Sequence, residues 1–206
     1  MEPYIVILLI NLLLAYFAER SFANNKKITY LMTSLIVIAN TIFAGCRDFG
    51  IGIDTTVYID KYFDNAEDLL GFANISDTDN DFGFWCLAYI ANLISDDSQS
   101  LLLVIAFFIN SLIFISICQY RNRFNFNICI ATLLFDMVFF CHTLNLMRQF
   151  CAIAILVFAF SQFIKKRYLV YIVLQVIALS FHKTSFVFLA VPLSWYISFV
   201  ESNKLK

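Results

Sequence analysis

Long apolar segments recur along this chain, and they constrain its fold more than any other feature. Seven of them could cross a bilayer: Tyr4–Ala18, Ile28–Cys46, Ser100–Tyr120, Phe126–Thr143, Leu146–Ile164, Tyr168–Phe181 and Ser185–Val200. A helix needs about 17–25 residues to cross the hydrocarbon core, so the first and the sixth segments are short and must borrow flanking polar residues. Because unpaired backbone groups are costly in lipid, these segments are predicted to be helices.

The composition agrees with a membrane domain. Of the 206 residues, 61% are hydrophobic and 14% are charged, whereas soluble domains have about half apolar and about a quarter charged residues. The two prolines and five glycines leave little material for flexible linkers. We therefore predict an all-α fold in which residues 1–206 form a single transmembrane domain, a polytopic integral membrane helical bundle of about seven transmembrane helices.

Two function classes find no support in the residues. The net charge of −1 provides no field that would attract nucleic acid, so no nucleic-acid partner is expected. The six cysteines are scattered, mostly within apolar segments, and they form no CxxC pair. The sequence therefore predicts no metal site, and it contains no motif for a cofactor.

The distribution of charge predicts an orientation in the membrane. Ten of the fourteen Lys and Arg residues fall in four clusters that the helix count places on one side: Arg20/Lys26/Lys27, Arg121/Arg123, Lys165/Lys166/Arg167 and Lys204/Lys206. By the positive-inside rule that side is the cytoplasm, so the N-terminus is expected outside. Residues 47–99 then form an extracytoplasmic loop. Within it, Phe82–Ile94 is apolar but only 13 residues long, a length that favours an interfacial or re-entrant helix.

The first cluster of polar residues that could take part in catalysis or binding begins where the second apolar segment ends. It runs from Arg47 to Tyr58 and contains Gly50 and Gly52, which allow tight turns. If a helix begins near Asp54, then Asp54 and Tyr58 share a face at a spacing of four residues. The alternative is an ordinary polar loop with an arginine that extends to the membrane interface.

The second cluster opens the fifth apolar segment. Asn145, Arg148, Gln149 and Ala152 recur at helical spacing on one face. A charge at the membrane edge is costly, so Arg148 is expected to face a cavity and to have a partner or a ligand. The alternative is a topological anchor, but anchoring cations belong on the cytoplasmic side.

The third cluster, His182-Lys183-Thr184-Ser185, lies in the turn between the last two apolar segments. Histidine is the natural proton-transfer group near neutral pH. A lone histidine is also common as a packed or solvated structural residue, and His142 on the same side is equally ambiguous.

Asp136 lies in the middle of the fourth apolar segment. A carboxylate at that depth is a candidate functional group. We favour the simpler interpretation, in which Asp136 hydrogen-bonds to Asn40 or Asn110 on neighbouring helices.

Taken together, the three clusters resemble the EpsG branch of the Wzy-type polysaccharide polymerases, over most of the chain. The family's R-x-x-x-G-x-D-[TY]-x-x-Y-x-x-x-F segment corresponds to Arg47, Gly50 or Gly52, Asp54, Thr55, Tyr58 and, one position late, Phe63. Its N-x-x-R-Q-x-x-A motif matches Asn145, Arg148, Gln149 and Ala152. Its F-H-K-[ST]-[SA] motif, followed by an apolar stretch to proline, matches Phe181, His182, Lys183, Thr184, Ser185 and Pro192. One departure is Asp81, which stands where the family's E-x-G-F/Y segment has glutamate.

The resemblance implies a glycosyltransferase of the bacterial inner (plasma) membrane. Such an enzyme joins oligosaccharide repeat units carried on polyprenyl pyrophosphate during exopolysaccharide, capsule or O-antigen biosynthesis. Arg47 and Arg148 would stabilise the pyrophosphate leaving group, and Asp54 or His182 would activate the acceptor hydroxyl. The residues expected to position or bind the substrate are Tyr58, Asn145, Gln149, Lys183 and Ser185.

Two other functions stay open at this point. The chain could be a flippase or transporter component for lipid-linked glycans, or a membrane acyltransferase that decorates the glycan with His182 as base. Other polysaccharide-assembly membrane proteins are further expected partners. Since family members usually continue well beyond the helix with Pro192, the resemblance also implies that these residues are the N-terminal portion of a longer architecture.

Overall fold

The computed structural model describes residues 2–66 and 81–204, and every regular element in these residues is a helix. Four helices are long and apolar enough to cross a membrane: α1 (Glu2–Ser21), α2 (Lys26–Gly45), α6 (Gln99–Phe124) and α9 (Met147–Ile164). Shorter apolar helices are α5 (Phe82–Ile94), the composite helix α7–η2–α8 (Ile128–Thr143) and α10 (Tyr168–Leu179). The remaining elements are α3 (Thr55–Tyr58), the π-helical turn η1 (Ile59–Phe63), the 3-10 helix η3 (Lys183–Leu189) and α11 (Ala190–Lys204). The predicted all-α membrane bundle is confirmed.

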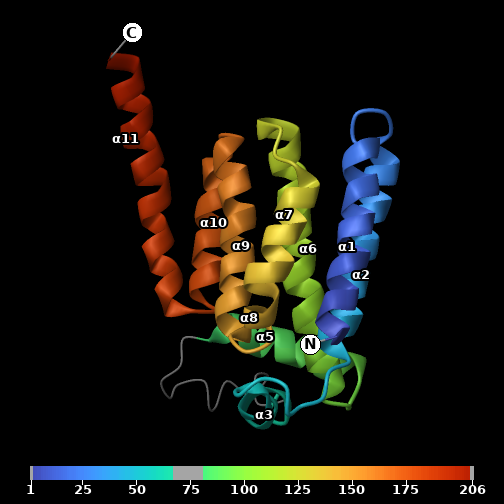
Figure 1. The fold of residues 1–206 in the computed structure, drawn as a ribbon. Helices are drawn as coiled ribbons and strands as arrows, with labels where there is room; N and C mark the ends of the chain where they lie inside the picture. Colours follow the sequence, from blue (N-terminus) through green and yellow to red (C-terminus); the bar gives the residue numbers. More distant parts are fainter. Residues whose placement is uncertain (1, 67–80, 205–206) are drawn as a thin grey trace.

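The long helices lie side by side and alternate in direction (Figure 1). One end of the bundle carries the α1–α2 turn, the end of α6, the α9–α10 turn and the end of α11. We call it the basic end, because the first three basic clusters lie there. The opposite end carries α3, α5 and the connections between the other helices. Residues 67–80 of the predicted extracytoplasmic loop lie outside the described residues.

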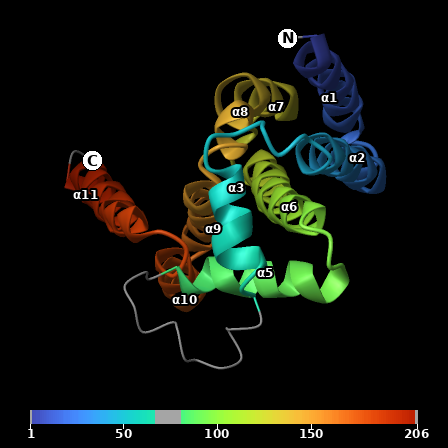
Figure 2. The same cartoon turned by 90° about the horizontal axis from the view of Figure 1, so that it is seen from below.

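Helix α5 lies across the opposite end of the bundle instead of running through it (Figure 2). Its bounds, Phe82–Ile94, are those of the short apolar segment in the sequence. Ser100 at the start of α6 fastens the end of α5, because its Oγ donates to the Ala91 carbonyl at 3.0 Å. An apolar helix of this length in this orientation fits the interfacial position that the sequence predicts.

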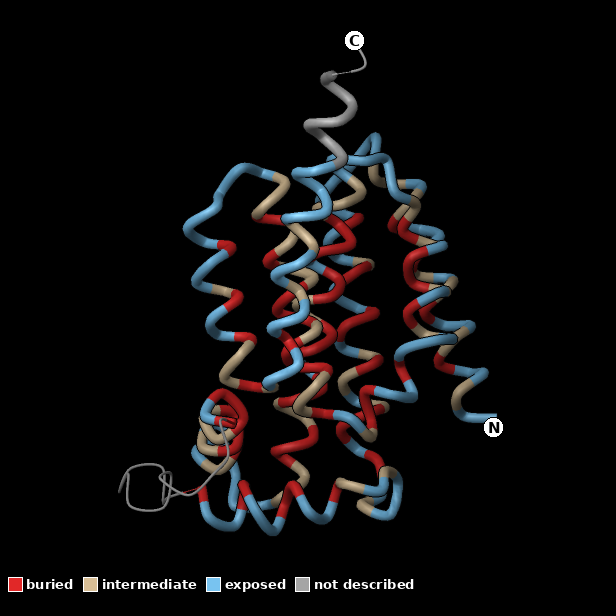
Figure 3. Tube along the Cα trace, turned by 90° about the vertical axis from the view of Figure 1, so that its left-hand side faces the viewer, coloured by how far each residue is buried: buried red, intermediate tan, exposed pale blue. Residues whose placement is uncertain are grey.

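The outward faces of the helices are apolar, as lipid contact requires. Helix α1 buries a single narrow stripe at three- and four-residue spacing: Ile7, Asn11, Ala15 and Ala18. Leu9 and Leu13, on its other faces, are 61% and 58% exposed. The same pattern of buried inner and exposed outer faces recurs along the bundle (Figure 3). In a soluble protein the outer faces would be polar.

A polar cluster joins four elements inside the bundle. Asn11 Nδ2 of α1 donates to Asn40 Oδ1 of α2 at 2.7 Å and to Asp136 Oδ2 of η2 at 2.8 Å. Asn40 Nδ2 in turn donates to Asp136 Oδ1 at 3.4 Å and to Asn110 Oδ1 of α6 at 3.3 Å. The predicted hydrogen bond between Asp136 and Asn40 is confirmed, and Asn110 reaches the carboxylate only through Asn40.

Candidate functional site

The candidate site is built around Arg148, in the first turn of α9. Its Nη1 forms an ion pair with the Asp81 carboxylate and donates to the Tyr62 hydroxyl at 3.0 Å. Tyr62 donates that hydroxyl to Asp81 Oδ2, also at 3.0 Å. The guanidinium carbon lies 5.4 Å from the ring centre of Tyr58 and 5.8 Å from that of Tyr62. Arg148 therefore has a partner, as the cost of a charge at the membrane edge leads one to expect.

Arg148 keeps donors that these partners do not use. Its side chain is 30% exposed, whereas that of Asp81 is 8% exposed. A guanidinium has five N–H donors, and its Nε is buried without a hydrogen-bond partner among the described residues. The carboxylate thus holds the guanidinium in place, and the exposed part of the side chain is the part that faces outward.

Arg47 is held differently, by backbone carbonyls. Its guanidinium donates to Ala44 O at 2.7 Å, to Leu144 O at 3.0 Å and to Ile51 O at 3.2 Å. The side chain is buried, and burial lowers the pKa of Arg47 to about 10, so the group stays charged at neutral pH. It fastens the end of α2 to the following loop and to the segment before α9.

The loop after Arg47 is shaped by Gly52 and Asn145. Gly52 has a φ of +106°, and a Cβ there would lie 2.7 Å from Leu144 O and 2.6 Å from Thr55 Oγ1. This position therefore requires glycine, which makes Gly52 the better match to the family's glycine. The Ile53 N–H donates to Asn145 Oδ1 at 3.2 Å, so Asn145 orders the loop that leads to Asp54.

Tyr58 and Asp54 lie one helical turn apart, as the sequence predicts. The Tyr58 N–H donates to the Asp54 carbonyl at 3.0 Å. The Tyr58 side chain is buried against Arg148, and this burial raises the pKa of the phenol. The Asp54 side chain makes no capping hydrogen bond to α3.

Helix α5 joins the third cluster to the site through Gly83. The Gly83 N–H donates to the Ser180 carbonyl at 2.9 Å. A Cβ at Gly83 would overlap the Phe181 ring and lie 2.7 Å from Ser180 Oγ. Only glycine lets the start of α5, with Asp81, approach the turn that precedes His182.

A cavity of about 270 Å³ lies between α9 and η3. Its polar lining comes from Gln149, His182, Thr184 and Ser185. Burial and the nearby Arg148 charge lower the pKa of His182 below its usual 6.5, so its imidazole is neutral at physiological pH. The Ser185 hydroxyl donates to the His182 carbonyl at 2.7 Å. Lys183 is exposed beside this cavity.

The predicted span Ser185–Val200 begins differently from the expectation. Residues Lys183–Leu189 form a 3-10 helix, and the α-helix starts only at Ala190. The cause is local, because both the backbone N–H and the hydroxyl of Ser185 bond back to His182 O, a three-residue spacing that closes a tighter turn.

The structure thus brings the three sequence clusters to one place and adds two residues to them. Asp81 and Tyr62 were not among the predicted site residues, although they are the direct partners of Arg148. Two signals could have indicated them. Asp81 occupies the acidic position of a family motif, and Tyr62 follows Tyr58 by four residues. No group of His, Cys, Asp or Glu suited to a metal ion occurs in the part of the chain that the structure describes.

The fold and the site together define a helical membrane protein with a partly exposed arginine, paired with a buried carboxylate, at the end of the bundle opposite the basic residues. The chain belongs to the EpsG family, whose model matches residues 30–206. The match includes all three clusters and leaves out the whole of α1. No curated protein and no solved structure matches the chain.

Proposed function

We propose that this chain polymerises lipid-linked oligosaccharide repeat units by glycosyl transfer from polyprenyl pyrophosphate. Membership of the EpsG family suggests a polysaccharide polymerase role. The observation that carries the proposal is Arg148, which is held by Asp81 and Tyr62 and whose side chain is 30% exposed. A departing pyrophosphate is a membrane-bound anion that needs such a preorganised, bidentate cation.

The proposed reaction is a single displacement at the anomeric carbon. The acceptor is a sugar hydroxyl of one lipid-linked unit, and the donor is the glycan on a second carrier. The bond from the acceptor oxygen to the anomeric carbon forms as the bond to the pyrophosphate oxygen breaks. The acceptor proton passes to a base, and polyprenyl pyrophosphate leaves with both electrons of the broken bond. Arg148 stabilises the charge that develops on the leaving oxygen.

Of the two candidate bases, the geometry favours His182. It lines the cavity with Gln149, the residue next to Arg148, and its lowered pKa keeps the imidazole free to accept a proton at pH 7. Asp54 does not line this cavity. We therefore assign the base to His182, Gln149 and Ser185 to substrate contacts, and Asn145 to the positioning of the loop with Asp54. Lys183, exposed beside the cavity, is proposed to meet the glycan or a second phosphate.

The role of His182 predicts a pH dependence. Because the pKa of His182 is lowered, polymerisation by the reconstituted protein should stay constant down to about pH 6.5 and fall below it. His182→Gln should reduce the rate about 10²–10⁴-fold and remove this acid limb. The measurement is the initial rate of polymer formation in proteoliposomes between pH 5 and 8. His142→Gln is the matched control, since His142 is exposed on the same end of the bundle. If the rate of His182→Gln still falls below about pH 6.5 as in wild type, then a residue other than His182 is the base.

The proposed location is the bacterial plasma membrane, with seven crossings, the N-terminus outside and the basic end in the cytoplasm. Alkaline phosphatase fused after Lys27, Arg123 or Arg167 should then be inactive, and fused at Asp97, between α5 and α6, it should be active. Phosphatase activity at Arg123 with none at Asp97 would invert this topology and place the site of Arg148 in the cytoplasm.

The polymerase proposal is tested by the products that a deletion strain accumulates. Loss of the protein should leave single repeat units on the lipid carrier on the extracytoplasmic side, and the wild-type gene should restore long polymer. Accumulation of the same units on the cytoplasmic side would indicate a flippase component. Long polymer that lacks only acyl groups would indicate an acyltransferase.

A further inference from the structure

A second polar pocket lies at the basic end, far along α9 from Arg148. It has a volume of about 290 Å³ between α6 and α9. Its polar lining consists of Gln119, Asn122 and Arg123 of α6 with Ser161 and Lys165 of α9. Because Arg148 begins α9 and Lys165 follows its last residue, about 25 Å of helix separates this pocket from the candidate active site.

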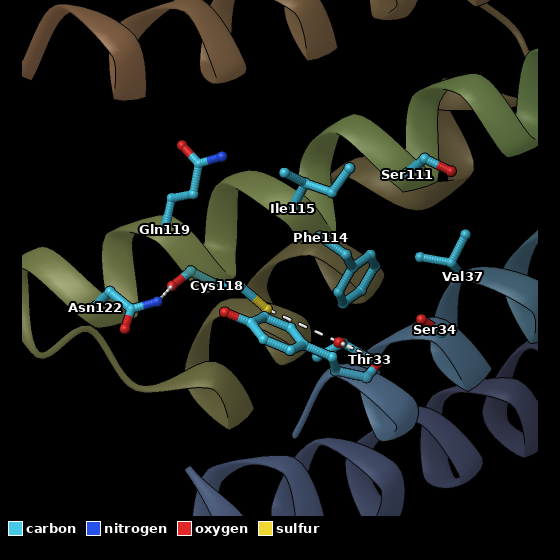
Figure 4. A pocket seen from close by; sticks show the side chains of 10 residues that line it. Thr33, Ser34, Val37, Ser111, Phe114, Ile115, Cys118, Gln119 and Asn122 are labelled. Carbon is cyan, nitrogen blue, oxygen red and sulfur yellow. Dashed lines mark hydrogen bonds between the residues drawn. The ribbon is translucent and has the colours of Figure 1, made fainter. Parts of the chain in front are cut away.

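Polar side chains of α6 meet those of the end of α9 in this pocket. Gln119 Oε1 accepts from Lys165 Nζ at 2.7 Å and from Gln162 Nε2 at 3.1 Å. The Ser161 hydroxyl lies 2.6 Å from both Gln119 Oε1 and Phe158 O, and it can donate to only one of them. Gln119 and Asn122 also line the neighbouring pocket between α2 and α6, where Gln119 points away from Thr33 (Figure 4). An amide oxygen has two lone pairs, so Lys165 and Gln162 already satisfy Gln119 Oε1. A lysine ammonium has three donors, so Lys165 has further N–H groups that an anionic oxygen can meet.

The cations of the pocket lack counter-anions. Arg121 pairs with Glu19 at 2.8 Å, but Arg123 and Lys165 have no ion-pair partner among the described side chains, those of residues 2–66 and 81–197. Burial, together with nearby Arg167, lowers the pKa of Lys165, which is the behaviour of a cation without a neighbouring negative charge.

An apolar groove of about 610 Å³ continues from this pocket toward the middle of the bundle. Tyr120 and Phe124 line both, so the pocket and the groove are neighbours. The groove follows α9 from Phe160 to Phe150, roughly 15 Å of helix, which is about the hydrocarbon depth of one leaflet. Its lining is hydrophobic, and the Tyr120 hydroxyl is satisfied by Val157 O at 2.7 Å.

We propose that this pocket and groove bind one phospholipid with an anionic headgroup, from the leaflet at the basic end. Arg123 and Lys165 bind the headgroup phosphate, and an acyl chain fills the groove. Basic pockets between membrane helices bind anionic headgroups by this combination of charge and hydrogen bonds. The site is distinct from the proposed catalytic one and does not depend on it.

Lipid titration of the purified protein in detergent, followed by native mass spectrometry, tests the proposal. Phosphatidylglycerol should bind with 1:1 stoichiometry and phosphatidylcholine should not. The double variant R123Q/K165Q should bind phosphatidylglycerol roughly 30-fold more weakly, from about 1 kcal/mol for each cation. Lys27→Gln, an exposed basic-end residue outside the pocket, should bind it like wild type. Leu134→Trp, at the half-exposed edge of the groove, should weaken binding without changing any charge.

Four results would overturn the proposal. The first is equal binding of phosphatidylglycerol and phosphatidylcholine, and the second is an equal loss of phosphatidylglycerol binding in Lys27→Gln and in R123Q/K165Q. The third is stabilisation of the protein by inorganic phosphate to the same extent as by phosphatidylglycerol. The fourth is displacement of phosphatidylglycerol by an equal concentration of polyprenyl phosphate. The last result would identify the carrier lipid as the occupant. Each variant is compared at the same monodisperse elution volume, so that a folding defect is not read as lost binding.

Discussion

Replacement of Arg148 by alanine is expected to lower polymer formation by about 10²–10³-fold, the usual cost of removing one preorganised donor group from a developing anion. Arg148→Lys should also be impaired, because lysine keeps the charge but loses the planar fork that binds two phosphate oxygens. The assay is the polymer ladder of a deletion strain that expresses each variant at equal membrane level, with the rate in proteoliposomes as the quantitative measure.

The control for Arg148→Lys is Arg20→Lys, at an arginine of the basic end whose guanidinium makes only a 3.4 Å contact to Tyr16. It should give a wild-type ladder. Asp81→Asn removes the charge that holds Arg148 and should impair polymerisation while keeping the Tyr62 hydrogen bond possible. A wild-type ladder from Arg148→Ala would remove the pyrophosphate role and leave the proposed polymerase without a mechanism.

Most of the fold could be predicted because lipid imposes a strong rule on the sequence. The apolar segments had to be helices, and the structure places helices over them, with α5 at the predicted residues. The bounds fail where local hydrogen bonding competes with the α-helix. The 3-10 turn after His182 is the clearest case, since it depends on how Ser185 folds back in three dimensions.

The site could be predicted only in part, because its contacts depend on how separate helices are placed in three dimensions. Helical spacing in the sequence predicts that Asn145, Arg148 and Gln149 share one helix face. The structure keeps Arg148 and Gln149 in α9, but Asn145 lies in the turn before it, because α9 begins at Met147. Helical spacing also does not say that Asp81, 67 residues away, is the anion that meets Arg148. That contact depends on the orientation of α5 across the bundle, which Gly83 permits by its close approach to Phe181. Tertiary placement of this kind leaves no periodic signal in a single sequence.

The second large effect is expected from replacing Arg47, and it is a loss of protein stability instead of the loss of activity expected at Arg148. Its donors are bonded to the carbonyls of Ala44, Ile51 and Leu144. Arg47→Ala would leave these carbonyls without their donor, at a cost of at least about 3 kcal/mol in the free energy of unfolding if each lost partner costs about 1 kcal/mol. We expect a lower melting temperature and less protein in the membrane, with polymer loss in proportion.

Arg47→Lys should be destabilised as well, because a compact ammonium cannot span carbonyls that the guanidinium fork reaches together. Fluorescence-detected size-exclusion chromatography after heating measures the stability of each variant, with Arg20→Ala as the exposed control. The comparison with Arg148 separates the two roles of these arginines. Arg148→Lys should form less polymer at normal protein stability, whereas Arg47→Lys should lose polymer formation and stability together. If Arg47→Ala instead melts like wild type and forms no polymer, Arg47 contacts the leaving pyrophosphate directly, as the family resemblance implies, and its carbonyl contacts rearrange when substrate binds.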